Sequence, residues 1–240
     1  MDASLSEIMV SIDELATRGR INRNRALAAW FAISFFDVDE DDALEAAAAD
    51  GGNDQGIDLV FPDEASQEIV VVQAYCPDNF TKKTPKNKWD AAVASVPFVR
   101  EPIELERVGR PDLSESISAF KNKYPEYGMA VGLVTLSLQS NEIDSSVRAH
   151  QKAKTNSGVT YFYSAQEDIL AKYRLLITSE AGIPDEVIKF SGNHIEDRGD
   201  YGRAWIGSIS ASELQRLYKA YADKLFAGNI RLFLGARKGV

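Results

Sequence analysis

The sequence predicts an α/β fold in which a mixed β-sheet is flanked by helices. Segments with apolar residues at helical spacing alternate with short runs rich in Val, Ile and aromatic residues. The first two of these runs are separated only by a Pro-containing turn, which indicates a β-hairpin. The later runs alternate with helices, which indicates that the hairpin continues into a mixed sheet.

The elements of the larger, N-terminal part follow from this pattern in order. Apolar residues at helical spacing predict a helix over 3–17, and Asn22 caps a second helix that extends to Phe36. The hairpin pairs a strand at 56–61 with a Val-rich strand at 68–75. The elements expected after it are helices at 89–99 and 113–124, a strand at 127–136, a helix at 141–154, a strand at 159–163 and a helix at 165–174.

Glycine, proline and asparagine residues interrupt the pattern between residues 178 and 200. They predict an irregular connector and a boundary between a domain at 1–176 and a small α/β appendage at 177–240. The elements expected in this C-terminal subdomain are a strand at 205–210, a helix through Leu225 capped by Ser210 or Ser212, and an apolar strand-like run at 229–235.

Composition excludes several classes of protein. The 36 acidic residues outnumber the 27 basic ones, and a net charge of -9 argues against coating nucleic acid or anionic membranes by bulk charge. One cysteine, Cys76, and two histidines, His150 and His194, exclude a disulfide framework and a Cys/His zinc site. No signal peptide or bilayer-length apolar run is present, so we expect a cytoplasmic protein without membrane contact.

Charge is unevenly distributed along the chain. Eleven acidic residues and no Lys or Arg lie between Asp37 and Glu64, and a group of four lysines follows shortly after. This lysine cluster consists of Lys82, Lys83, Lys86 and Lys88. Carboxylates that hold a divalent cation, followed by lysines that hold phosphates, favour a phosphodiester substrate. The simpler interpretation is a solvated helix start followed by a solvated loop.

The most informative motif is DGGNDQGIDLVF, which begins at Asp50, together with the later IVVVQAY. Alternation along the second strand places Gln73 and Tyr75 on one face, and a matching register adds Asp58 from the first strand. Glycines before the strand allow Asp54 to approach the same point. The simpler alternatives are turn chemistry for the aspartates and strand-edge hydrogen bonding for Gln73.

This motif resembles the PD-(D/E)XK nuclease superfamily, particularly its Mrr-like branch and the nuclease-like N-terminal region of abortive infection phage resistance (AIPR) proteins. The segments SELQRLY at 212–218 and LFAGNIRLFLG at 225–235 are similar to the lead-in of the AIPR proteins. The resemblance implies a restriction-endonuclease-like core and a further C-terminal domain beyond residue 240. It also implies a Mg²⁺- or Mn²⁺-dependent endonuclease that hydrolyses DNA in phage defence, by restriction or abortive infection, and it is compatible with a homodimer.

The resemblance also implies roles for individual residues. Asp58 is the metal-binding acid of the hairpin, Gln73 is the second metal ligand, and Asp54 is a further ligand. An acid from the preceding helix completes the metal shell, and Glu45 is slightly favoured over Asp50. The lysine cluster is expected to contact DNA phosphates.

Tyr75 stands where the superfamily has a catalytic lysine. A phenol with a pKa near 10 donates a hydrogen bond but supplies no positive charge to the phosphate. One alternative is that a lysine of the lysine cluster supplies that charge. Another is a catalytically inactive nuclease-like module that binds nucleic acid or assembles within a larger defence protein. A third alternative, consistent with the acidic pI of 4.9, is an α/β binding domain with no connection to nucleic acid.

Overall fold

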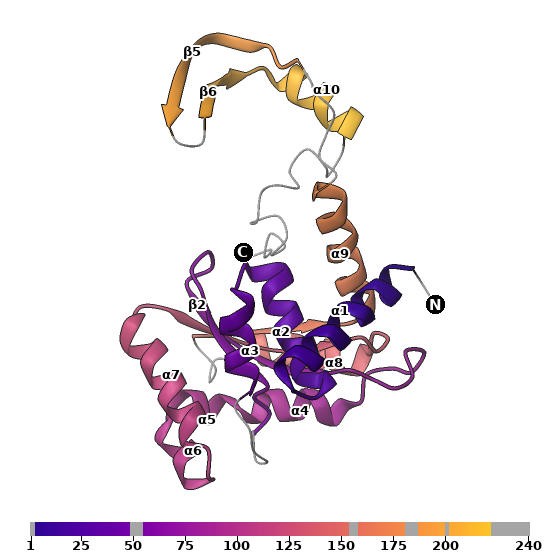
Figure 1. The fold of residues 1–240 in the computed structure, drawn as a ribbon, viewed down its shortest axis with the longest axis vertical. Helices are drawn as coiled ribbons and strands as arrows, with labels where there is room; N and C mark the ends of the chain where they lie inside the picture. The colour runs from indigo at the N-terminus through magenta and orange to yellow at the C-terminus, as the bar shows by residue number, and fades with distance from the viewer. Residues whose placement is uncertain (1–2, 49–54, 154–157, 181–186, 200–201, 222–240) are drawn as a thin grey trace. The chain divides into compact units, whose positions relative to one another are not determined.

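The structure is a computed structural model that describes residues 3–48, 55–153, 158–180, 187–199 and 202–221. The chain divides into two compact units, Met1–Tyr173 and Arg174–Val240, which we call unit 1 and unit 2. Unit 1 contains a four-stranded sheet, and unit 2 contains a two-stranded hairpin and a helix (Figure 1). Among the described residues, no helix is long and apolar enough to cross a membrane.

Three helices open unit 1: α1 (Ala3–Gly19), α2 (Arg23–Phe36) and α3 (Glu40–Ala48). The side-chain oxygen of Asn22 accepts a hydrogen bond from the backbone N–H of Arg25, which confirms the predicted cap of α2. Apolar residues cover nearly the whole circumference of α2, and the helix is accordingly buried between its neighbours and the sheet.

The acidic run, which extends from Asp37 to Glu64, includes the first turn of α3. The carboxylate of Asp39 accepts hydrogen bonds from the backbone N–H groups of Asp41 and Asp42, at 2.9 and 3.4 Å. Three further acids lie in the first turn, where the positive end of the helix dipole stabilises negative charge. This part of the acidic run therefore has the role of a solvated helix start.

The sheet of unit 1 is mixed, as the sequence predicts. Its strands are β1 (Leu59–Asp63), β2 (Glu68–Tyr75), β3 (Gly128–Thr135) and β4 (Val159–Ser164), and they lie in that order. The hairpin pairs β1 and β2 antiparallel, and β2, β3 and β4 run parallel. Because β2, β3 and β4 run parallel, the residues at their carboxyl ends lie at the same edge of the sheet.

A second group of helices follows β2 along the chain: α4 (Lys86–Ala94), α5 (Val96–Arg100), α6 (Ile103–Arg107), α7 (Pro111–Lys123) and α8 (Asn141–Lys152). The single helix predicted at 89–99 is wrong, because α4 begins earlier, directly after Pro85, and ends at Ala94, and a separate short helix that begins at Val96 has Pro97 in its first turn. The short helix α6, which Pro102 precedes, was not predicted.

Two hydrophobic cores fill the space on the two faces of the sheet. The first core lies between one face and α1, α2, α3 and the start of α9 (Gln166–Glu180), and the second lies between the other face and α4 to α8. Alternation along β2 sends Val72 and Ala74 into the first core and Val71 into the second. Gln73 and Tyr75 therefore point toward the face that α4 covers.

Unit 2 contains the antiparallel hairpin of β5 (Phe190–Gly199) and β6 (Gly202–Ile209), followed by α10 (Ala211–Tyr221). The irregular connector predicted through residue 200 is wrong in its second half, where β5 lies. The glycine and asparagine residues of β5 are poor strand formers, so its hydrogen bonds to β6 decide its structure. The predicted end of the last helix and the apolar run at 229–235 lie outside the described residues.

Candidate functional site

The structure brings Asp58 and Gln73 together, as the alternation predicts. The backbone N–H of Asp58 donates to the carbonyl of Val72 at 2.8 Å, which extends the hairpin by one residue beyond β1. The side-chain amide of Gln73 donates to Oδ2 of Asp58, and the backbone N–H of Ala74 donates to the same oxygen at 2.8 Å. Only 7% of Asp58 and 8% of Gln73 is exposed, so this polar pair is removed from bulk water.

A glycine holds the chain that enters the pair. Gly56 has a φ of +78°, and a Cβ at this position would lie 2.6 Å from the carbonyl carbon of Ala91 and 3.2 Å from Oε1 of Gln73. A side chain would therefore collide with the backbone of α4. The turn before Asp58 packs directly on α4, and this close contact places the Asp58–Gln73 pair beneath the helix.

Helix α4 also brings a lysine to this edge of the sheet. Trp89 and Ala92 of α4 are fully buried in the second core, which fixes the position of the helix. The ammonium nitrogen of Lys88 lies 5.1 Å from the centroid of the Tyr75 ring, a cation–π contact. Because Tyr75 follows Gln73 on the same face of β2, a positive charge lies beside the end of this strand.

The other members of the lysine cluster lie on α4 and on the loop before it. Lys86 forms an ion pair with Asp90 one turn later on α4. Lys82 and Lys83 are exposed, on a loop that is anchored to the segment after β3. Leu138 accepts the backbone N–H of Thr84 at 3.0 Å and donates to the carbonyl of Lys82 at 2.9 Å.

A second contact fixes this loop. The hydroxyl of Tyr163, at the end of β4, donates to Oγ1 of Thr84 at 2.5 Å, and burial raises the pKa of the Tyr163 phenol so that it stays protonated. The loop is therefore attached both to β4 and to the segment after β3. Lys82 and Lys83 are displayed at the same edge of the sheet as Gln73 and Tyr75.

Of the three other acids that the sequence offers as metal ligands, the structure describes only Glu45. Glu45 is exposed on α3, whose buried residues Ala43 and Ala47 belong to the first core, on the opposite face of the sheet from Gln73. Asp50 and Asp54 lie outside the described residues. Within the described part of the chain, no group of three or more His, Cys, Asp or Glu side chains is arranged to hold a metal ion.

Cys76 lies beside the site but on the first-core side. Its backbone N–H donates to Oδ1 of Asn24 at 2.8 Å, and its thiol is 4.0 Å from the sulfur of Met9. Burial raises the pKa of the thiol to about 11. The thiol is therefore protonated at neutral pH, which argues against a nucleophilic role.

Sequence reasoning missed two groups of aromatic side chains. In unit 1, the His150 ring is half-buried against the rings of Trp89 and Tyr161, at centroid distances of 5.9 and 5.3 Å. In unit 2, His194 and Trp205 belong to an exposed ring series on the hairpin. The strand predicted at 205–210 contains Trp205, whereas His194 lies in the segment that the sequence predicts to be an irregular connector.

Comparison with known proteins adds no assignment. The chain matches no family model, no curated protein and no solved structure among those compared.

Proposed function

We propose that this chain is a metal-dependent endonuclease that hydrolyses phosphodiester bonds in DNA, acting in phage defence. One observation carries the proposal: the buried Asp58–Gln73 pair lies at the end of β2, where Tyr75 holds the ammonium group of Lys88. The motif around the pair resembles the hairpin of the PD-(D/E)XK nucleases. The role in defence rests on that resemblance and on the AIPR-like segments at 212–218 and 225–235.

The donor set of the pair suits a small divalent cation. Mg²⁺ prefers oxygen ligands and commonly uses one or two carboxylates together with water. Asp58 supplies a carboxylate, and Gln73 supplies an amide whose oxygen and nitrogen exchange places when the amide group turns over. When bound, Mg²⁺ or Mn²⁺ would lower the pKa of water and neutralise charge on the phosphate. Asp54 would be a further ligand.

The chain's own residues would place and neutralise the substrate. Lys88 would set a positive charge beside the phosphodiester, the task that the missing strand lysine performs in the superfamily. Tyr75 would be a positioning residue, because its ring holds the lysine over the end of β2. Lys82 and Lys83 would contact neighbouring phosphates from the loop anchored at Leu138.

Cleavage assays on plasmid and phage DNA test this function. We expect cleavage with Mg²⁺ or Mn²⁺, none with EDTA, and loss of cleavage in Asp58→Asn. The matched control is Asp63→Asn, because Asp63 is also a buried aspartate of the hairpin but caps the β1–β2 turn. Cleavage at the native rate by the Asp58→Asn variant would overturn the assignment.

A second candidate is a catalytically inactive nuclease-like module that binds nucleic acid or assembles with other defence components. Two observations favour it: Oδ2 of Asp58 already accepts two hydrogen bonds, and Tyr75 replaces the lysine. It predicts no cleavage with any metal and no rise in melting temperature with Mn²⁺, because a bound ion must stabilise the folded state. Salt-sensitive DNA binding that depends on Lys82 and Lys83 would then support the module.

A further inference from the structure

One face of the β5–β6 hairpin carries a series of planar side chains. The register pairs His194 with Gly207, Glu196 with Trp205 and Arg198 with Arg203. Directly opposed residues of an antiparallel pair lie on the same face. Rings and guanidinium groups therefore share one face, which we call the ring face.

The rings are stacked along this face. A Cβ at Gly207 would lie 2.5 Å from the Phe190 ring, so the glycine makes room for that ring on the hairpin. Phe190 and His194 are stacked, with centroids 5.3 Å apart and planes 20° apart. His194 meets Trp205 edge-on at 4.9 Å, and the guanidinium of Arg203 lies 5.4 Å from the Trp205 ring.

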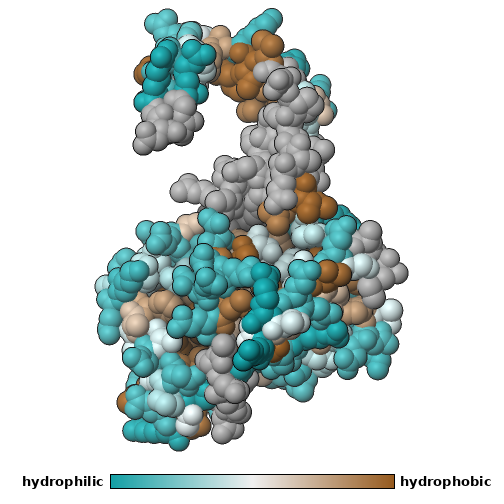
Figure 2. Space-filling model, viewed as in Figure 1, coloured by the Kyte–Doolittle hydropathy of each residue, from teal (hydrophilic) through white to brown (hydrophobic). Residues whose placement is uncertain are grey.

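The ring face is open to solvent. Trp205 is 47% exposed, and His194, Arg198 and Arg203 are also exposed. Figure 2 shows further hydrophobic surface on unit 2 where β6 meets α10. Large exposed aromatic side chains indicate an interaction surface.

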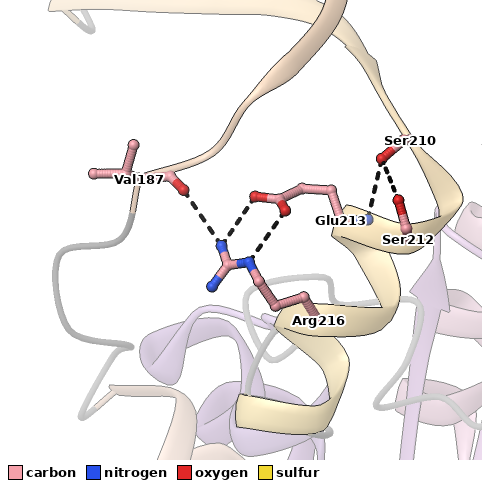
Figure 3. Close-up of polar contacts among 5 residues, drawn as sticks. All are labelled: Val187, Ser210, Ser212, Glu213 and Arg216. Atoms are coloured by element: carbon pink, nitrogen blue, oxygen red, sulfur yellow. Dashed lines mark hydrogen bonds and ion pairs between the residues drawn. The ribbon is translucent and has the colours of Figure 1, made fainter.

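Unit 2 holds this hairpin at its base. Ser210, just after β6, caps α10 through a 3.1 Å hydrogen bond from the backbone N–H of Glu213 (Figure 3). The guanidinium of Arg216 pairs with the Glu213 carboxylate at 2.9 Å and donates to the carbonyl of Val187 at 3.3 Å. These contacts join the segment before β5 to the helix after β6, so both ends of the hairpin are held while the ring face stays open.

The charge of the ring face suits an anion. Among the described residues of this face, Arg198 and Arg203 are opposed by one acid, Glu196, which contacts the two guanidinium groups at 2.6 and 3.6 Å. The face is therefore net positive in a chain whose net charge is -9. Arginine is also the side chain best suited to bind phosphate and stack on planar groups. Exposed rings beside guanidinium groups match a ligand that combines flat, apolar bases with phosphates.

We propose that the ring face binds single-stranded nucleic acid. Unpaired bases would stack on the exposed rings, and Arg198 and Arg203 would face the phosphates. This binding uses none of the residues around Asp58, so it does not depend on the proposed nuclease chemistry. In a working nuclease it would add a second contact with strands that are already unpaired.

Fluorescence anisotropy on the full chain tests the proposal. The probes are fluorescein-labelled oligo(dT), oligo(U) and a DNA duplex, each of about 20 nucleotides or base pairs, in order to exceed a typical stacking site. We expect tighter binding of the single strands than of the duplex, and comparison of the first two probes distinguishes DNA from RNA. Trp205→Ala is expected to raise the Kd for the preferred single strand about tenfold, and Trp205→Phe is expected to retain most of the binding.

The matched control is Ile206→Ala. Ile206 neighbours Trp205 on β6, is 58% exposed and faces the opposite side of the hairpin, paired with Ile195. Its substitution is expected to leave the Kd unchanged. Arg203→Lys is a milder substitution than Trp205→Ala, because it keeps the positive charge and removes only the planar guanidinium group. A several-fold rise in Kd is expected for this variant.

Three results would overturn the proposal. One is a Trp205→Ala variant that binds single strands as tightly as Ile206→Ala does. Another is equal or tighter binding of the duplex, and the third is a dimer, seen by light scattering, that Trp205→Ala dissociates without any change in Kd. Binding is measured in EDTA, where cleavage is not expected, so failure of the nuclease assignment and failure of this proposal give different results.

Discussion

Substituting Gly56 by alanine tests how the turn before Asp58 is held against α4. The new Cβ would enter the carbonyl group of Ala91, and the backbone would keep a φ of +78° that disfavours every residue with a side chain. The left-handed conformation costs about 1–2 kcal/mol. Overpacking against a fixed helix costs about 1–3 kcal/mol more. We therefore expect a loss of stability of about 3 kcal/mol.

Gly109→Ala separates the two contributions. Gly109 has a similar φ of +84°, but a Cβ there would meet nothing within 4 Å. For a unit of this size, about 1 kcal/mol lowers the melting temperature by roughly 2–4 °C. Differential scanning calorimetry should therefore show a drop of about 6–12 °C for Gly56→Ala, from about 3 kcal/mol, and about 3–6 °C for Gly109→Ala, from about 1.5 kcal/mol. Equal drops in the two variants would refute the close packing of this turn on α4.

Three further predictions follow from described contacts. Lys88→Ala is expected to slow metal-dependent DNA cleavage about 100-fold. Lys123→Ala removes the last lysine of α7, which lies 5.0 Å from the Tyr124 ring, and should not slow cleavage. Asn22→Ala removes the cap of α2 and should lower stability by about 1 kcal/mol in urea unfolding, with an unchanged m-value. Because burial raises the pKa of Cys76 from 9.0 to about 11, folding favours the protonated thiol, so stability should fall as the pH rises from about 9 to 11, and Cys76→Ala should abolish that part of the decline.

The sequence predicted the central pair of the site because strand alternation is a local property. Gln73 and Asp58 lie on hairpin strands whose register follows from a short turn, so their contact requires little tertiary information. Lys88 was one of four candidates, since spacing alone did not reveal that α4 begins at Lys86 and packs on β2 through Trp89. The sequence favours Glu45 as a metal ligand, but the structure places it on α3, which packs on the other face of the sheet.

The sequence by itself determined the mixed sheet and the cap of α2, because periodicity and capping act between residues that are near in the chain. The tertiary structure alone decided which lysine meets Tyr75 and that 190–199 forms a strand. Both depend on partners distant in sequence: α4 is placed by the second core, and β5 is stabilised by hydrogen bonds to β6 rather than by its own strand propensity.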